Sequence, residues 1–174
     1  MNFQNISRHI GGWIFLIMLL PSLSFAQAQS KKGSNMKKAS NEMNKKTETA
    51  TFAAGCFWCV EEQFKQLDGV ISVTSGYTGG TVANPTYKQV CTGTTDFAET
   101  VKVQYDPIKV DLPFLIDLYF KTIDPTSVNK QGNDRGTQYR TGIYYTDPAD
   151  LSVIQETVHR LAATYTRPLA VEMK

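Results

Sequence analysis

Apolar and polar residues recur along the chain with two different periods. Three segments place apolar residues three or four positions apart, which predicts amphipathic helices at residues 58–67, 112–123 and 148–161. Four segments are β-branched, aromatic or alternating in polarity, which predicts strands at residues 51–54, 70–77, 99–105 and 138–146. Residues 84–91 predict a turn or short helix, and residues 126–137 a polar loop.

These elements follow one another as strand–helix–strand twice, with a final helix at the end. Two split units of this kind in tandem are typical of the ferredoxin-like fold. We therefore predict an α+β two-layer sandwich, in which helices pack on an antiparallel or mixed sheet and long loops carry the function. Asp111 precedes the helix at 112–123 and is its candidate N-cap.

Residues 1–28 have the features of a secretory signal peptide. Arg8 supplies positive charge, residues 11–20 form an apolar run, and Ala26 and Ala28 offer cleavage sites. This run is shorter than the roughly 20 apolar residues that cross a bilayer. We therefore expect cleavage and export to the periplasm or another extracytoplasmic compartment, with an uncleaved membrane anchor as the alternative.

Residues 29–50 contain six lysines, two glutamates and no aromatic or branched aliphatic residue. Such a segment buries too little apolar surface to fold. We predict a disordered, solvated linker, whose positive charge could instead contact an anionic membrane. Residues 51–174 then form one domain. Its fourteen aspartates and glutamates outnumber its eleven lysines and arginines, which argues against nucleic acid as a partner.

All three cysteines lie in this domain, and Cys56 and Cys59 form a C-x-x-C pair with two aromatic residues between them. Three cysteines make a poor disulfide framework for an exported protein. A zinc site needs a second set of ligands, and the domain offers only Cys91 and His159, so we predict no metal. A redox pair is the favoured interpretation, and a static disulfide is its alternative.

Cys56 is the better nucleophile of the pair by position. If the strand ends at Gly55 and the helix begins near Phe57, free backbone N–H groups at the helix start stabilise a Cys56 thiolate. Residues i and i+3 of a helix have Cβ atoms about 5–6 Å apart, whereas a disulfide needs about 3.5–4.5 Å. A modest distortion would let Cys59 resolve an oxidised Cys56.

Glu99 lies on the apolar side of its predicted strand, with Val101, Val103 and Tyr105. Burial would raise the pKa of its carboxyl and keep it protonated near neutral pH, ready to give a proton. Alternatively, Glu99 sits at the end of the strand and reaches water. The pattern alone does not decide between the two.

Several motifs occur in an order that resembles one known family. They are GCFW at 55–58, GYTGG at 76–80, NPTY at 84–87 with Cys91, AE at 98–99, YDP at 105–107, and QGNDRGTQYR at 131–140. Together they resemble the A-type peptide methionine sulfoxide reductases, over about residues 51–172. The resemblance implies a reductase without a cofactor that acts on methionine-S-sulfoxide, free or in proteins.

The resemblance also implies a role for each site residue. Cys56 attacks the sulfoxide sulfur, and Glu99 is the acid, which favours its burial over exposure at a strand end. The remaining assignments are Tyr87 and Tyr139 for binding the oxygen, Asp134 for lining the site, and Phe57 and Trp58 for gripping the S-methyl group.

The implied cycle passes through a sulfenic acid on Cys56, which Cys59 captures as a disulfide. Thioredoxin or a periplasmic dithiol would then reduce that disulfide, and we expect the enzyme to be a monomer. Cys91 is the reserve resolving residue, with a buried structural thiol as its alternative. Directly before Ala98 and Glu99, where many relatives have histidine, this chain has Phe97, so this position gives Glu99 no polar contact.

Relatives usually continue beyond the position of Lys174 with a tail that can carry resolving cysteines. We therefore expect residues 51–174 to be a catalytic domain without that tail. Two alternatives to the reductase are a thiol–disulfide exchange protein of the thioredoxin kind and a non-enzymatic surface module.

Overall fold

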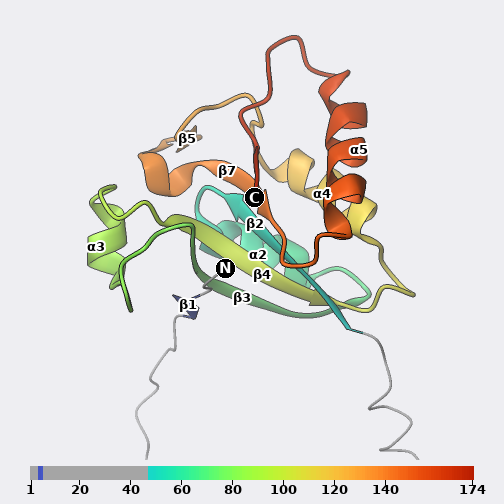
Figure 1. Ribbon diagram of the computed structural model, residues 1–174, viewed down its shortest axis with the longest axis horizontal. Coiled ribbons are helices and arrows are strands. Elements are labelled where there is room, and N and C mark those ends of the chain that lie inside the picture. Colours follow the sequence, from blue (N-terminus) through green and yellow to red (C-terminus); the bar gives the residue numbers. More distant parts are fainter. Residues whose placement is uncertain (1–3, 6–46) are drawn as a thin grey trace, which may run out of the picture. The chain divides into compact units, whose positions relative to one another are not determined.

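The computed structural model describes residues 4–5 and 47–174. Within this part of the chain, a six-stranded sheet consists of β1 (Gln4–Asn5), β2 (Glu48–Ala54), β3 (Val70–Thr78), β4 (Ala98–Tyr105), β7 (Thr141–Tyr144) and β8 (Glu172–Met173). The helices are α2 (Phe57–Lys65), α3 (Tyr87–Cys91), α4 (Leu112–Thr122) and α5 (Asp150–Ala162). A hairpin of β5 (Lys130–Gln131) and β6 (Asp134–Arg135), followed by the short 3₁₀ helix η1 (Thr137–Tyr139), connects α4 to β7 (Figure 1).

The sheet has the strand order β1-β3-β4-β2-β7-β8. β4 pairs antiparallel with both β2 and β3, β2 pairs antiparallel with β7, and β7 pairs parallel with β8. The unit β2-α2-β3 therefore has β4 inserted between its strands, and the unit β4-α4-β7 has β2 inserted in the same way. This interleaving is the ferredoxin-like arrangement, and the prediction of an α+β sandwich with a mixed sheet is confirmed.

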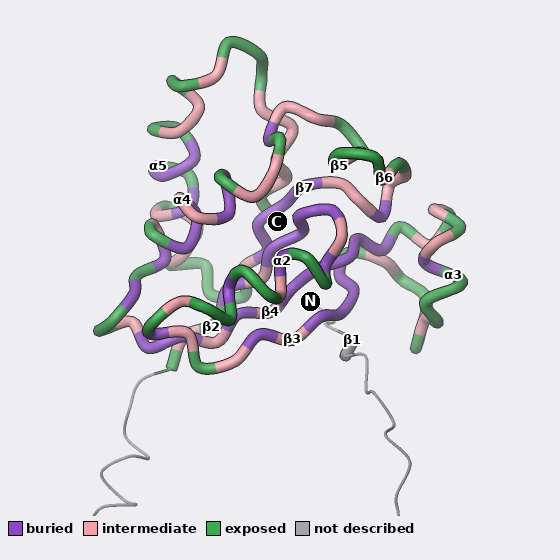
Figure 2. The backbone as a smooth tube through the Cα atoms, turned by 180° about the vertical axis from the view of Figure 1, so that it is seen from behind, coloured by how far each residue is buried: buried purple, intermediate pink, exposed green. Residues whose placement is uncertain are grey.

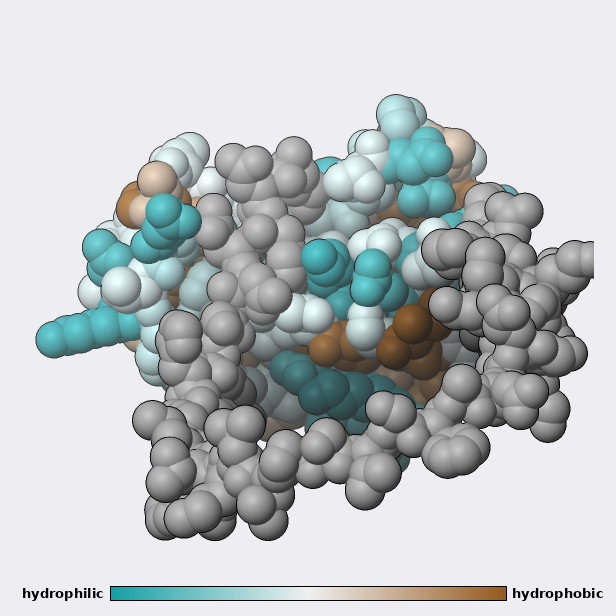
Figure 3. Space-filling view, turned by 90° about the horizontal axis from the view of Figure 1, so that it is seen from below, coloured by the Kyte–Doolittle hydropathy of each residue, from teal (hydrophilic) through white to brown (hydrophobic). Residues whose placement is uncertain are grey.

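Helices α2 and α4 cover the same face of the sheet. The ring of Phe52, on β2, stacks on Phe64 of α2 with centroids 5.2 Å apart and on Tyr119 of α4 with centroids 5.1 Å apart. Helix α5 lies against α4 (Figure 1), and an ion pair between Arg160 of α5 and Asp117 of α4 also joins the two helices. The buried residues accordingly follow the central strands and the inner helix faces, and the outer face of α2 is exposed (Figure 2). Seen from below, apolar residues lie near the middle of the molecule among polar ones (Figure 3).

Helix α4 follows its sequence pattern closely. Its buried side chains are those of the apolar stripe: Leu112, Leu115, Ile116, Tyr119 and Phe120. Asp111 caps the helix, because its Oδ1 accepts a hydrogen bond of 2.9 Å from the backbone N–H of Phe114. The prediction of this N-cap is confirmed.

Two strands begin three residues away from the start that the sequence predicted. Residues 48–50, which we assigned to the linker, belong to β2, since Thr49 pairs with Gln104 and Ala50 is buried in the core. The predicted strand at 138–146 is shorter, because Gln138 and Tyr139 lie in η1 and β7 covers only Thr141–Tyr144.

Most of the predicted signal peptide and linker lies outside the described residues. Of the first 46 residues only Gln4 and Asn5 are described, and they pair antiparallel with Tyr77 and Gly76 on β3. Among the residues that the structure describes, no helix combines the length and apolar character needed to cross a membrane.

Candidate active site

The site begins where β2 passes into α2. Gly55 has a φ of 80°, a left-handed conformation that favours glycine, and a Cβ at this position would lie 2.6 Å from Cβ of Gln131. Cys56 follows as the N-cap of α2, and its carbonyl oxygen accepts from the N–H groups of Cys59 and Val60 at 3.2 and 3.4 Å. The Cys56 side chain is partly exposed. The turn thus presents a thiol at the start of a helix, as the sequence predicted.

Glu99 is buried on β4, with 2% of its surface exposed. Its Oε2 accepts a hydrogen bond of 3.3 Å from the backbone N–H of Phe57, the amide directly after Cys56. Burial raises the pKa of Glu99 to about 7, against the lowering effect of the Phe57 N–H and with a further increase from the charge of Asp134. Of the two positions that the sequence left open for Glu99, the structure shows the buried one.

Aromatic rings surround the first turn of α2. Phe57 is buried, whereas Trp58 is 58% exposed, and their ring centroids lie 5.1 Å apart. Trp58 also lies 5.7 Å from Tyr87 on α3, and Phe57 lies 5.8 Å from Tyr77 on β3. The rings therefore form a continuous apolar surface that runs from the core to solvent beside Cys56.

Tyr87, Tyr139 and Asp134 come from three different elements and meet around Glu99. A hydrogen bond between Tyr87 and Cys91, together with burial, raises the pKa of Tyr87 to about 12, and the charges of Cys91, Glu99 and Tyr139 add to this. Burial raises the pKa of Tyr139, and Glu99, Cys91 and Asp134 raise it further. Both phenols therefore stay protonated at neutral pH and can donate hydrogen bonds.

The three cysteines are free, and each of the two resolving candidates has its own partner. A hydrogen bond with Cys56 and the electrostatic effect of the Cys56 side chain raise the pKa of the exposed Cys59. Cys91 is partly exposed at the end of α3 and is hydrogen-bonded to Tyr87. Cys59 is therefore the thiol in contact with Cys56, while Cys91 lies on the tyrosine side of the site.

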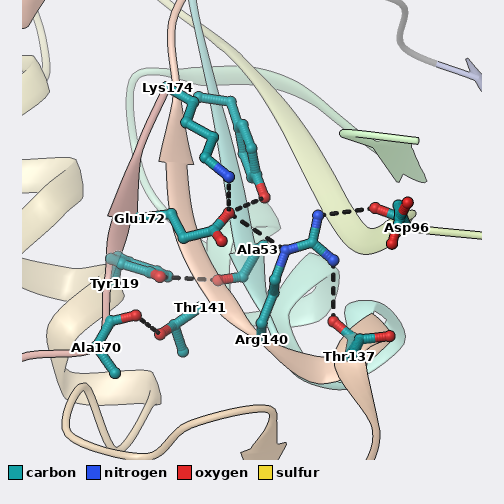
Figure 4. Close-up of polar contacts among 10 residues, drawn as sticks. Ala53, Asp96, Tyr119, Thr137, Arg140, Thr141, Ala170, Glu172 and Lys174 are labelled. Carbon is teal, nitrogen blue, oxygen red and sulfur yellow. Dashed lines mark hydrogen bonds and ion pairs between the residues drawn. The ribbon is translucent and has the colours of Figure 1, made fainter. Parts of the chain in front are cut away.

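Arg140, the residue after Tyr139, makes polar contacts with three separate segments of the chain (Figure 4). Its guanidinium donates to the carbonyl oxygens of Thr137 at 3.0 Å and Asp96 at 2.9 Å and to Oε2 of Glu172 at 3.2 Å. Lys174 pairs with the same Glu172 oxygen at 3.1 Å. These contacts join the turn before Tyr139, the approach to β4 and the terminal strand β8.

The pKa of Glu172 reflects this network. Partial burial opposes ionisation, but hydrogen bonds from Lys174 and Arg140 and their positive charges hold its pKa below the ordinary value. Glu172 is therefore ionised at neutral pH and keeps Arg140 in place.

A second anchor holds the hairpin that carries Asp134. Oε1 of Gln131 accepts from the N–H of Asp124 at 2.8 Å, and Nε2 of Gln131 donates to the Asp124 carbonyl at 2.9 Å. The same Gln131 side chain packs on Gly55. The hairpin therefore sits directly over the turn that presents Cys56.

No three His, Cys, Asp or Glu side chains among residues 4–5 and 47–174 are grouped so that they could hold a metal ion. His159, the one histidine of the domain, is exposed on α5.

Comparison with known protein families classifies this fold and site. The family model "Peptide methionine sulfoxide reductase" matches residues 48–174. The chain belongs to this family. It is accordingly an oxidoreductase, and the predictions of family and enzyme class are confirmed.

Individual members of the reductase family are similar over most of the domain. The peptide methionine sulfoxide reductase MsrA of Lachnoclostridium phytofermentans is 52% identical over 132 residues, which are 76% of this chain and 78% of that protein. The solved methionine sulfoxide reductase A of Corynebacterium diphtheriae is 36% identical, with a TM-score of 0.70 over 73% of this chain and 64% of that chain.

Mxr1 from Saccharomyces cerevisiae has been solved in more than one state. In its reduced form it is 36% identical to this chain, with a TM-score of 0.70 over 73% of this chain and 75% of Mxr1. In complex with Trx2 the identity is 25% and the TM-score 0.54, over 72% of this chain and 73% of Mxr1.

Sequence reasoning on this reductase missed three residues that shape the site. Tyr77, Gln131 and Arg140 all lie within the motifs that carry the family resemblance, but no role followed from their type. Tyr77 pairs directly with Glu99 across β3 and β4. The signal that could have found it is the strand register, which the sequence does not contain.

Proposed function

We propose that this reductase acts on methionine-S-sulfoxide, free or within proteins, with Cys56 as nucleophile and Glu99 as acid. The observation that carries the proposal is the hydrogen bond from the Phe57 N–H to the buried Glu99 carboxyl. It holds the acid beside the peptide unit that follows the nucleophile. Because the pKa of Glu99 is about 7, a large fraction of the carboxyl is protonated at neutral pH.

The first half of the reaction transfers oxygen to Cys56. The thiolate attacks the sulfoxide sulfur and forms a transient S–S bond while the sulfoxide oxygen takes the proton of Glu99. This S–S bond and the S–O bond of the substrate then break as an S–O bond to Cys56 forms, and the products are methionine, a Cys56 sulfenic acid and a Glu99 carboxylate. The substrate sulfur is reduced by two electrons, and the Cys56 sulfur is oxidised by two.

The surrounding groups suit this step. The hydroxyls of Tyr87 and Tyr139 stay protonated and would bind the sulfoxide oxygen as negative charge develops on it. The Phe57 and Trp58 rings offer an apolar surface next to Cys56 for the S-methyl group. Asp134 lines the site and disfavours ionisation of Glu99 through its own charge.

The second half regenerates the thiolate. The Cys59 thiol attacks the Cys56 sulfenic acid, an S–S bond forms, and water leaves. The contact between the two thiols supports Cys59 in this role, with Cys91 as the reserve. A thioredoxin-type dithiol then reduces the disulfide and becomes oxidised itself. Support comes from Mxr1 of Saccharomyces cerevisiae, which is similar to this chain and has been solved in complex with Trx2.

The test is dithiol-dependent reduction of peptides that carry either epimer of methionine sulfoxide. We expect turnover of the S epimer only, and none with the Cys56→Ser variant. A Cys56→Ser protein that keeps turnover would overturn the assignment of the nucleophile, and turnover of the R epimer alone would overturn that of the substrate.

We further propose that the chain is exported and works as a monomer. Support for export comes from the apolar run at 11–20 and the small residues that follow it. Sequencing the N-terminus of the mature protein separates cleavage from a retained anchor, and its mass in solution tests the monomer.

A further inference from the structure

Tyr77 is a buried residue of the site to which the reaction above gives no role. It lies on β3 directly opposite Glu99 on β4, so the two side chains share one face of the sheet. The Tyr77 ring is held between Phe57, at 5.8 Å, and Phe97, at 6.3 Å. Only 2% of the residue is exposed, so bulk water does not solvate its hydroxyl.

The Tyr77 hydroxyl has no hydrogen-bond partner among the residues that the structure describes. Buried phenol hydroxyls are nearly always hydrogen-bonded, because leaving one unpaired costs folding free energy. Burial raises the pKa of Tyr77, and the charges of Glu99, Cys91 and Tyr87 raise it further. The hydroxyl is therefore a permanent donor that lies within electrostatic range of the acid.

We propose that Tyr77 is a positioning residue whose hydroxyl donates a hydrogen bond to one buried water, which in turn donates to the ionised Glu99 carboxyl. A bound water needs two or more polar partners in a space closed to solvent. Around Tyr77, the polar partners for such a water are the Tyr77 hydroxyl, the Glu99 carboxyl and the Tyr87 hydroxyl.

Such a water would affect how readily Glu99 releases its proton, an effect that rests on the proposed role of Glu99 as acid. A donor to the ionised carboxyl favours ionisation, so the water-linked Tyr77 lowers the proton affinity that burial raises. The other groups that interact with Glu99 lie on every neighbouring element. They are the Phe57 N–H on α2, Tyr87 on α3, Asp134 on β6 and Tyr139 on η1, while β2 presents uncharged Ala53 opposite Thr100.

The test compares the pH dependence of kcat/KM for the full chain and its Tyr77→Phe variant, with a methionine sulfoxide peptide and dithiothreitol as substrates. The rate should fall at alkaline pH as Glu99 loses its proton. We expect this fall to move by about half a unit to one unit toward higher pH in Tyr77→Phe. Tyr105→Phe is the matched control, because Tyr105 is a buried β4 tyrosine that bonds to Glu48 instead.

A Tyr77→Phe protein whose alkaline fall stays at the position of the unmodified protein would overturn the proposal, whatever its stability. Should this variant fail to fold, 3-fluorotyrosine at position 77 replaces it. Its more acidic hydroxyl is a stronger donor, so the fall should move to lower pH, and an unmoved fall again refutes the role. A high-resolution crystal structure without a water between Tyr77 and Glu99 would do the same.

The Glu99→Gln variant separates this inference from the proposed function. If Glu99→Gln keeps the alkaline fall, Glu99 is not the acid and the proposed mechanism fails. If Glu99→Gln abolishes the fall while Tyr77→Phe leaves it in place, the mechanism stands and only the role of Tyr77 is lost.

Discussion

Replacing Glu99 with glutamine should remove a loss of stability that the folded protein undergoes as the pH rises, while it impairs the reaction. The ordinary pKa of a glutamate is 4.5, and the folded protein raises that of Glu99 to about 7. Below pH 4.5 the carboxyl is protonated in both the folded and the unfolded chain, and it costs nothing. Above pH 7 it is ionised in both, and the folded chain then carries the whole unfavourable difference.

The size of this penalty follows from the shift. A shift of this extent corresponds to about 3 kcal/mol of unfolding free energy, lost progressively as the pH rises from about 4.5 to 7. Glutamine does not titrate, so Glu99→Gln lacks this loss. Any constant cost of its amide, which brings donors into a buried place, is the same at every pH and does not affect the slope.

The assay is urea unfolding from pH 4 to pH 9 in the presence of a reductant, with the free energy extrapolated to water. Relative to the unmodified protein, Glu99→Gln should gain about 3 kcal/mol between the two ends of this range. Glu156→Gln, which removes an exposed carboxyl from α5, controls for the loss of one charge. A difference that stays constant across the range would refute the raised pKa and with it the protonated acid at neutral pH.

Three further predictions concern the cysteines, the turn before Cys56 and the N-cap of α4. Cys59→Ser should accumulate the sulfenic acid after one turnover and lose recycling, whereas Cys91→Ser should recycle normally; mass spectrometry of the protein after one equivalent of substrate distinguishes the two, and the reverse outcome would make Cys91 the resolving residue. Gly55→Ala should lower the unfolding free energy by about 2–4 kcal/mol, because it combines a positive φ with a 2.6 Å approach to Gln131; a loss below 1 kcal/mol in urea would show that the turn relaxes. Asp111→Ala should cost about 1 kcal/mol and leave kcat/KM unchanged, which unfolding and steady-state kinetics measured together can check.

Local patterns were sufficient where one element determines its own structure. The apolar stripe and the capping aspartate of α4 predict that helix because both signals lie within a dozen residues. The strand at 138–146 was predicted too long for the opposite reason. Gln138 and Tyr139 look strand-like, but the neighbouring Arg140 donates to the Thr137 carbonyl. The distant residues Asp96 and Glu172 hold the Arg140 side chain in that position, which favours a 3₁₀ turn there.

The burial of Glu99 could not be predicted from alternation alone. Its strand pattern is the same whether the strand end faces solvent or lies under a helix. What decides is that β4 is central, with β2 and β3 on either side, and that the first turn of α2 closes over its beginning. Family resemblance supplied this answer because it summarises tertiary contacts that a single sequence does not display.

The hydrogen bond between Phe57 and Glu99 has a mechanical consequence. The Glu99 carboxyl accepts from the peptide N–H that directly follows Cys56. The spacing between the Glu99 carboxyl and the Cys56 sulfur is therefore tied to the main chain at this turn and to the sheet that carries Glu99. The exposed side chains of Trp58 and Tyr87 can therefore adjust to differently shaped polypeptides without changing this spacing. The reacting pair keeps its alignment while the entrance adapts to each damaged protein.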